Sequence, residues 1–364
     1  MTLLHNRFRG VLLGAAAFLT LGLATSQACT SLLVKTSDDG YVYGRTMEFG
    51  FELKSKVVVA PRGNSYTSTA ADGQKGLAWT GKYAFVGMNG LDKPILADGM
   101  NEKGLVGGIF YFPGYAEYTP PKDADPAQSM APWEFVSWAV ANFATVDEIK
   151  AAVENVRVIG LEFPGAGFVP PFHYSFHDAS GKSIVIEPTG GELKVFDNPF
   201  GVLTNSPTFD WHLTNLGNYV KLSPDNVDSL KVNGQTIPSF GQGSGWLGIP
   251  GDPTPPSRFI RAIAFSMTVD PEPNGIKSVR LVEHIMNNFD IPFGTIRPAK
   301  GDECDYTQWT TVADIGTGTY YVKTYNNQTL QAIALENFDP NAKTVSYAPI
   351  EDAEQTPFLA FPKK

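Results

Sequence analysis

Cys29 is the residue of this sequence with the clearest capacity for covalent chemistry. It is one of only two cysteines in a chain of 364 residues, and it directly follows a segment, residues 1–28, that is typical of a cleavable export signal. A thiol acts as a nucleophile when a nearby base takes its proton. A cysteine at a free N-terminus carries that base itself, because the α-amino group has a pKa of about 8. Cleavage before Cys29 would therefore create a nucleophile and its base in one residue.

The segment before Cys29 has the parts of a signal peptide in the usual order. Arg7 and Arg9 form a basic start, and an apolar run follows over residues 11–24. Residues 26–28, Ser-Gln-Ala, then place small side chains at positions −3 and −1 of a cut. The apolar run is shorter than the roughly 20 residues of a membrane-spanning helix. We therefore expect export to the periplasm or secretion, with no membrane span.

Two other interpretations of Cys29 stay open at this point. A cysteine after a signal can be acylated as a lipid anchor, although Ser26 and Gln27 depart from the Leu-like and small residues usual at those positions. Cys29 could also form a disulfide bond with Cys304. In the first case the protein would be a lipid-anchored or periplasmic binding protein for small molecules, without catalysis.

The residues after Cys29 predict a β-hairpin that brings charged side chains to the cysteine. Strand-like runs at 30–34 and 41–45 flank the turn sequence Asp-Asp-Gly. Cys29 lies at the open end of this hairpin. Arg45 and Glu48 lie near the same end, so hairpin geometry alone can place both beside the thiol.

The rest of the chain predicts one α+β domain over residues 29–364. Strands, helices, strands, helices and strands follow in that order, which favours two antiparallel sheets between helix layers. Residues 217–256 are rich in Gly, Pro, Ser and Asn and predict a long surface excursion. The other predicted elements are a β-meander over 56–115, helices from 132, over 145–156, 257–268 and 276–289, a strand that includes His173 and His177, and closing strands at 319–324, 330–335 and 345–347.

Charge and composition indicate which kinds of molecule the protein binds. The formal net charge is −9, and an acidic chain lacks the positive field that nucleic-acid binding requires. The 5 histidines are scattered, and no Cys/His spacing suits a structural metal site. His173 and His177 share one face of their predicted strand, where we expect structural roles. The sequence thus indicates an aqueous small-molecule partner and no metal or organic cofactor.

Several segments in order along the chain together resemble the choloylglycine hydrolase family, which contains bile salt hydrolases and penicillin V acylases and belongs to the N-terminal nucleophile hydrolases. The matching segments are Cys29-Thr30-Ser31, Gly44-Arg45-Thr46-Met47-Glu48, Asn101-Glu102-Lys103-Gly104-Leu105, Phe112-Pro113-Gly114, Leu203-Thr204-Asn205-Ser206-Pro207, Ser257-Arg258-Phe259-Ile260-Arg261-Ala262 and Tyr306-Thr307-Gln308-Trp309. The resemblance implies a four-layer αββα sandwich.

The resemblance also implies roles for five residues. Cys29 would supply the thiolate and the base, and Arg45 beside it would lower the pKa of the thiol. Glu48 stands where the family usually has aspartate and would orient the α-amino group. Asn205 would donate to the oxyanion of the tetrahedral intermediate. Arg258 matches a second arginine near the nucleophile.

The implied activity is hydrolysis of a linear amide with an apolar acyl group. The Tyr111 backbone would complete the oxyanion hole, and Phe49 and Tyr115 would line the acyl site. The family varies at Tyr111 between an amide side chain, which goes with bile salt hydrolases, and tyrosine, which goes with penicillin V acylases. We therefore expect a penicillin V acylase-like enzyme that could also cleave N-acyl homoserine lactones and so quench quorum sensing, with conjugated bile salts as the alternative. The family also suggests a homotetramer, which residues 217–256 could assemble; the alternative is that these residues form a solvated loop that covers the site.

Overall fold

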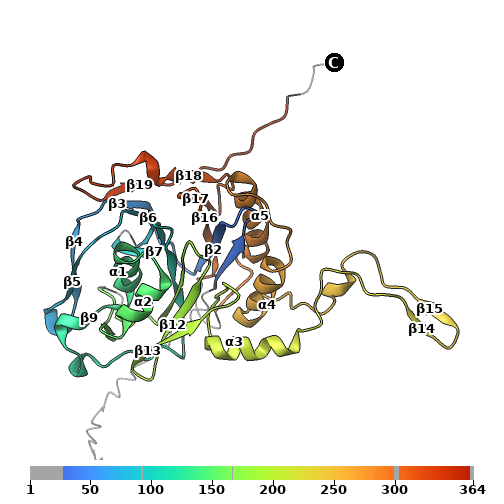
Figure 1. The fold of residues 1–364 in the computed structure, drawn as a ribbon, viewed down its shortest axis with the longest axis horizontal. Helices are drawn as coiled ribbons and strands as arrows, with labels where there is room; N and C mark the ends of the chain where they lie inside the picture. The colour runs from blue at the N-terminus through green and yellow to red at the C-terminus, as the bar shows by residue number, and fades with distance from the viewer. Residues whose placement is uncertain (1–27, 92, 166, 299–302, 361–364) are drawn as a thin grey trace, which may run out of the picture.

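Two stacked β-sheets between two layers of helices make up the fold (Figure 1). The structure is a computed structural model that describes residues 28–91, 93–165, 167–298 and 303–360. The predicted signal segment lies outside the described residues, apart from Ala28. The order of layers agrees with the αββα sandwich expected from the sequence.

The sheet that begins with Cys29 has five strands in the order β1-β2-β16-β17-β18. Their bounds are β1 Cys29–Lys35, β2 Tyr41–Phe49, β16 Tyr306–Asp314, β17 Thr319–Thr324 and β18 Gln331–Ala334. The predicted hairpin is confirmed, since β1 and β2 pair antiparallel with Cys29 opposite Met47. The pairing sets Cys29 at the same end of the sheet as Glu48.

The second sheet has eight strands in the order β13-β12-β11-β8-β7-β6-β3-β19. In chain order they are β3 Val57–Ala60, β6 Phe85–Gly90, β7 Lys93–Asn101, β8 Val106–Tyr111, β11 Phe172–His177, β12 Ser183–Thr189, β13 Glu192–Asp197 and β19 Ser346–Ala348. Smaller two-stranded sheets are formed by β4 Ser65–Thr69 with β5 Lys75–Thr80, and by β9 Ser129–Met130 with β10 Arg157–Val158. β7 and β8 face β2 across the space between the two large sheets.

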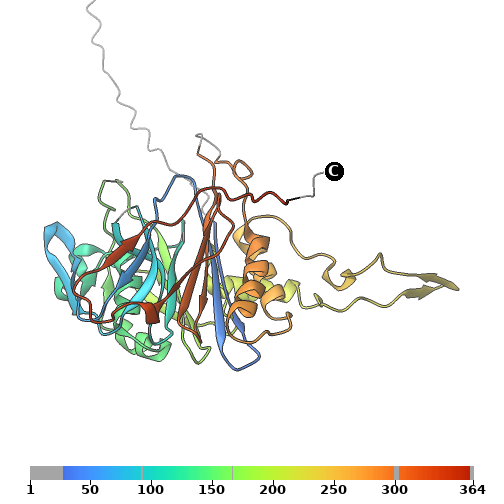
Figure 2. The ribbon, with the colours of Figure 1, turned by 90° about the horizontal axis from the view of Figure 1, so that it is seen from above.

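Helices cover the outer face of each large sheet. The helices are α1 Phe135–Asn142, α2 Val146–Val153, α3 Phe209–Asn215, α4 Pro255–Ser266 and α5 Ile276–Met286. α4 packs on β1 and α5 on β2 and β16, while α1 packs on β7 and β8. The view from above in Figure 2 shows α4 and α5 on one outer side and the α1 and α2 region on the other.

β2 uses its two faces for different purposes. Side chains alternate along a strand, so Tyr43, Arg45 and Met47 point between the sheets, while Gly44 faces α5. A Cβ atom at Gly44 would lie 2.6 Å from a methyl carbon of Val282. The missing side chain thus lets α5 pack closely behind the strand that carries Arg45.

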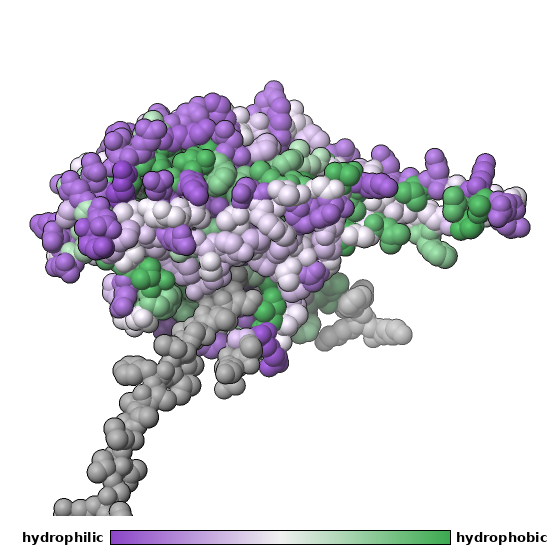
Figure 3. Space-filling view, turned by 90° about the horizontal axis from the view of Figure 1, so that it is seen from below, coloured by the Kyte–Doolittle hydropathy of each residue, from purple (hydrophilic) through white to green (hydrophobic). Residues whose placement is uncertain are grey.

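The excursion predicted at 217–256 is an arm that projects from the body (Figure 2). It contains the short hairpin β14 Leu230–Val232 and β15 Gln235–Ile237, whose residues are all exposed. Apolar side chains are exposed along it, as Figure 3 shows. They are Val220, Val227, Leu230, Val232, Ile237, Phe240 and Leu247. In the single chain these apolar side chains are therefore in contact with water.

Candidate active site

Cys29 is buried at the start of β1. Its Sγ lies 3.7 Å from Nη2 of Arg45 and 3.8 Å from Sδ of Met47. The thiol is free, so Cys29 forms no disulfide bond with Cys304 and that alternative is wrong. In this uncut chain the nitrogen of Cys29 is a peptide amide joined to Ala28.

Arg45 reaches the thiol from a fixed position between the sheets. Its guanidinium donates to the carbonyl oxygens of Ala97 and Ile109 on the facing sheet. Nη1 lies 3.6 Å from Oδ1 of Asp98, and the guanidinium carbon lies 4.6 Å from the ring centre of Phe110. Because both charged side chains are fully buried, Arg45 has little freedom to move away from Cys29.

Asp98 is itself held by hydroxyl donors. Tyr43 donates to its Oδ1 at 2.9 Å, and Thr311 and Tyr320 donate to its Oδ2 at 2.8 and 2.6 Å. Asp98 is not identifiable from the sequence, because the surrounding Ala-Asp-Gly suggests a turn. Its only signal was a carboxylate close to a predicted strand, and nothing in the sequence connected it with Arg45.

Burial raises the pKa of the Cys29 thiol, and the positive charge of Arg45 offsets this only in part. The lowering of the thiol pKa expected from Arg45 is therefore outweighed in the uncut chain. The physical reason is desolvation, which disfavours a thiolate in a dry site. Cleavage before Cys29 would add an ammonium group next to the thiol, a second positive charge that favours the thiolate.

Asn205 and Arg258 surround the backbone of Cys29. Oδ1 of Asn205 accepts from the Cys29 N–H and from Nη2 of Arg258, both at 2.8 Å, while its Nδ2 donates to the Tyr111 carbonyl at 2.8 Å. Arg258 also donates to the Cys29 carbonyl and to Oγ1 of Thr30, the latter at 2.7 Å. Two donors on one side and an acceptor on the other fix which way the Asn205 amide points.

Glu48 is a buried carboxyl close to the same backbone. Its N–H donates to the carbonyl of Ala28 at 3.1 Å, and its Oε1 accepts from Thr307 at 2.8 Å. Its Oε2 has no hydrogen-bond partner among the described residues. Burial raises the pKa of Glu48 to about 8, although Arg258 acts against this. The sequence analysis quoted Thr307 only as part of a motif and did not link it to Glu48.

An apolar cavity of about 120 Å³ opens beside Cys29. It is lined by Cys29, Met47, Phe49, Phe51, Leu53, Gly90, Leu91, Ile95, Ala97, Ile109, Tyr111, Trp133, Phe163, Phe168, Pro170 and Phe172. Phe49, which we expect to line the acyl site, and Tyr111, which we expect at the oxyanion hole, both line this cavity. Tyr115 does not line the cavity: its ring stacks on Phe112 at 5.5 Å and it is exposed.

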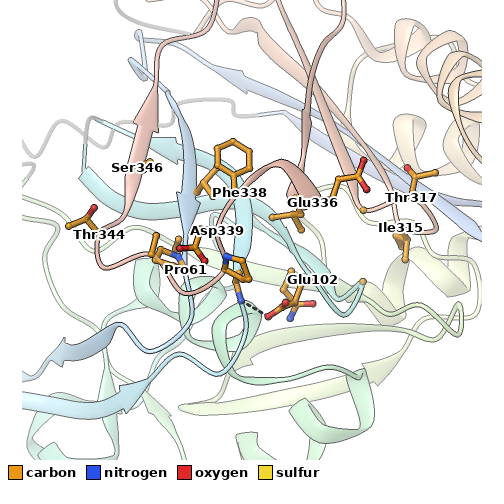
Figure 4. A pocket seen from close by; sticks show the side chains of 18 of the residues that line it. Pro61, Glu102, Ile315, Thr317, Glu336, Phe338, Asp339, Thr344 and Ser346 are labelled. Carbon is orange, nitrogen blue, oxygen red and sulfur yellow. Dashed lines mark hydrogen bonds between the residues drawn. The ribbon is translucent and has the colours of Figure 1, made fainter.

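A larger cavity of about 480 Å³ lies away from Cys29, between β3, the turn after β16 and the segment after β18 (Figure 4). Its lining includes Glu102, Ile315 and Phe338, and none of the residues around Cys29. Ile315 follows the end of β16 that pairs with Val42, whereas Cys29 pairs with Met47. This cavity is therefore separate from Cys29.

The described residues contain neither a candidate metal site nor a membrane-spanning helix. Among them, no group of three or more His, Cys, Asp or Glu side chains is arranged to hold a metal ion. None of their helices is long and apolar enough to cross a membrane.

A cysteine that begins a strand of one of two stacked antiparallel sheets, covered by helices, defines the class of N-terminal nucleophile hydrolases. The model of the linear amide C–N hydrolases, choloylglycine hydrolase family, matches residues 29–345. The chain belongs to this family and is a hydrolase of carbon–nitrogen bonds in linear amides.

Its relatives include bile salt hydrolases and a penicillin V acylase. The chain is 38% identical to the bile salt hydrolase/transferase of Clostridium perfringens, over 88% of this chain and 97% of that protein. A solved variant of the conjugated bile acid hydrolase from that organism has a TM-score of 0.81 and 32% identity, and the match covers 91% of this chain and all of that one. The penicillin V acylase of Pectobacterium atrosepticum is 28% identical, over 91% of this chain and 85% of that protein.

Proposed function

We propose that the mature enzyme begins at Cys29 and hydrolyses N-acyl conjugates with a large apolar acyl group, conjugated bile salts first among them. The observation that carries the proposal is the position of the Cys29 thiol, between Arg45 and an apolar cavity. A purely binding function, with Cys29 as a lipid anchor, finds no support in a family of hydrolases.

The proposed mechanism uses the terminal amine as the only base. The α-amino group of Cys29 takes the thiol proton, and Sγ attacks the amide carbonyl to give a tetrahedral oxyanion held by Asn205 and the Tyr111 backbone N–H. The ammonium then gives its proton to the leaving nitrogen, the C–N bond breaks and a thioester remains. Water, deprotonated by the same amine, hydrolyses the thioester and restores the thiol.

Glu48 and Arg258 would set the geometry of that amine. The unpartnered Oε2 of Glu48 offers an acceptor for a terminal ammonium once Ala28 has left. An ammonium beside Glu48 would stabilise its charged form and lower its pKa from the value in the uncut chain. Arg258 would fix the position of Asn205 relative to the Cys29 carbonyl, because it donates to both.

The relatives favour conjugated bile salts over the penicillin V acylase-like substrate expected from the sequence. Two observations keep phenoxyacetyl amides as the second candidate: Tyr111 lines the cavity, and the volume of about 120 Å³ is small for a whole steroid. A direct comparison of kcat/KM for cholyl, phenoxyacetyl and long-chain acyl-homoserine amides separates them. Dominant turnover of either of the last two would overturn the bile-salt assignment, and turnover of the acyl-homoserine substrate alone would make quorum quenching its activity.

Removal of one ring from the cavity tests where the acyl group binds. Phe49→Ala deletes a lining ring, and we expect KM for the preferred substrate to rise about 10-fold or more, because roughly 2 kcal/mol of apolar contact is lost. Tyr115→Ala is the matched control, since it removes a neighbouring ring outside the lining. Equal effects of the two substitutions on KM would contradict this position for the acyl group.

The position of the cut can be read from the mass of the exported protein. We expect the periplasmic or secreted form to begin with an unmodified Cys29, and Ala28→Arg, which places a large residue at position −1, to retain the uncut, inactive chain in the cell. Intact mass spectrometry of fractionated cells checks both. A diacylglyceryl adduct on Cys29, or an active chain that begins elsewhere, would contradict export by simple cleavage.

The exposed arm supports assembly into a homo-oligomer, as the family suggests. Phe240 is fully exposed and Leu247 nearly so. Both belong to an arm that exposes several apolar side chains, and extended apolar surface marks interaction sites. We expect Phe240→Ser with Leu247→Ser to convert a tetramer into smaller species in light scattering, whereas Phe358→Ser, at an equally exposed site near the C-terminus, leaves it intact. A monomeric parent protein would remove the arm's proposed role in assembly.

A further inference from the structure

We propose that His212 and His173 are positioning residues for Asn205: each ring donates a hydrogen bond to one of two successive backbone carbonyls, and together they set the direction of the Asn205 amide. The inference rests on the proposed role of Asn205 in holding the oxyanion. It gives a task in the reaction to His173, for which the sequence predicts only a structural role, and to His212.

His212 holds the carbonyl of Asn205 itself. Its Nε2 lies 2.9 Å from the Asn205 oxygen, and because a carbonyl only accepts, Nε2 must carry the hydrogen. The fully buried ring stacks on Phe259 of α4, with ring centres 4.6 Å apart. Its Nδ1 has no hydrogen-bond partner among the described residues, so the carbonyl of Asn205 is the one polar anchor seen for this ring.

Desolvation lowers the pKa of His212 to about 4, with Arg258 and His173 adding to the effect. The ring is therefore neutral over the working range of most hydrolases. A neutral ring with its hydrogen on Nε2 is the form that the contact with Asn205 requires.

His173 holds the preceding carbonyl. Its Nε2 lies 3.2 Å from the Thr204 oxygen and its Nδ1 lies 3.2 Å from Oε1 of Glu187. Oε1 of Glu187 also accepts from the N–H of Phe209, the first residue of α3, at 2.9 Å. The same carboxylate thus links the His173 ring to the helix that carries His212.

The ring of His173 also connects the two walls of the oxyanion site. It lies parallel to Phe112, with ring centres 4.2 Å apart. Phe112 follows Tyr111, whose carbonyl accepts from the Asn205 amide. His173 therefore contacts both segments that would surround an oxyanion.

Holding two successive carbonyls has a specific mechanical consequence. The Thr204 carbonyl belongs to the peptide plane before the Asn205 Cα, and the Asn205 carbonyl belongs to the plane after it. The two planes meet at that Cα, so fixing both sets φ and ψ of Asn205 and hence the direction of its side chain. An oxyanion donor misplaced by about 1 Å can cost about 100-fold in rate.

Paired substitutions at position 212 separate positioning from simple stability. His212→Phe keeps a ring against Phe259 but removes the donor, and His212→Gln keeps an N–H donor at nearly the same reach. With the amide turned over fastest, we expect kcat to fall 10- to 100-fold in His212→Phe with KM within about twofold, and to recover to within about fivefold of the parent in His212→Gln.

His177→Phe is the matched control, because it removes a fully buried histidine of β11 whose hydrogen bonds among the described residues go to Ser175 and Ser183. We expect it to lower the melting temperature without lowering kcat of the folded protein. The rate of Cys29 alkylation by iodoacetamide should be the same in all three variants, since the nucleophile is untouched. If His212→Phe is insoluble, His212→Asn, whose amide is too short to reach the carbonyl, replaces it.

The outcomes separate the positioning role of the two histidines from the oxyanion role of Asn205 on which it rests. Full kcat in His212→Phe or its replacement, or an equal loss in His177→Phe, would overturn the positioning role. Asn205→Ala, measured alongside, tests the basis: if it keeps full kcat, the proposed oxyanion role fails first. A loss in Asn205→Ala without a loss in His212→Phe would reject the histidines alone.

Discussion

Replacement of Cys29 by serine is expected to lower kcat/KM by at least about 1,000-fold while the protein stays folded. Serine keeps the size and the terminal amine but has a hydroxyl that the amine deprotonates far less readily than a thiol. The contact at 3.7 Å between Arg45 and Sγ of Cys29, which would stabilise a thiolate, is also lost. Steady-state kinetics with the preferred amide, and circular dichroism for the fold, measure both parts of the expectation.

Cys304→Ser provides the control for this substitution. Cys304 is the other buried cysteine and does not line the cavity beside Cys29, so its replacement should leave kcat/KM within about threefold. Turnover near the parent level in Cys29→Ser would remove the proposed mechanism. Loss in both variants would point instead to a general sensitivity of the core.

The sequence could predict the residues next to Cys29 because they are local. Strand pairing of β1 and β2 follows from a turn signal and two apolar runs, and the pairing alone brings Arg45 and Glu48 to the thiol. Asn205 and Arg258 are far away in the chain, and only the family resemblance connected them with Cys29. In the structure, hydrogen bonds of 2.8 Å join Asn205 to both Cys29 and Arg258.

The parts missed from the sequence have weak local signals. β16 is central to the sheet that begins with Cys29, yet its sequence YTQWTTVAD lacks a regular apolar alternation because its side chains are buried on both faces. α3 was also missed, since a helix of 7 residues has too few turns for an apolar period. Asp98 gains its importance from side chains distant in the chain, and His173 and His212 gain theirs from distant backbone carbonyls. No spacing in the sequence encodes these contacts.

Asn205→Asp should produce the second largest loss of activity, a fall of about 100- to 1,000-fold in kcat. The substitution replaces a hydrogen-bond donor to the oxyanion by a negatively charged oxygen. Oδ1 can still accept from Arg258 and from the nitrogen of Cys29, so the local geometry is retained. The amide Nδ2 becomes an oxygen, which faces the Tyr111 carbonyl and would repel a developing oxyanion instead of stabilising it. Loss of one such donor costs about 3–4 kcal/mol of transition-state stabilisation.

Asn101→Asp separates this effect from the cost of burying a carboxylate. Asn101 is also buried, and its Nδ2 donates to the carbonyls of Val140 and Phe143 at 2.7 Å. The same exchange there should lower the melting temperature but leave kcat of the folded fraction unchanged, because no reacting atom lies near. If Asn205→Asp matched Asn101→Asp in kcat, Asn205 would serve only to hold the Cys29 backbone, and the oxyanion would have to be stabilised by backbone N–H groups alone.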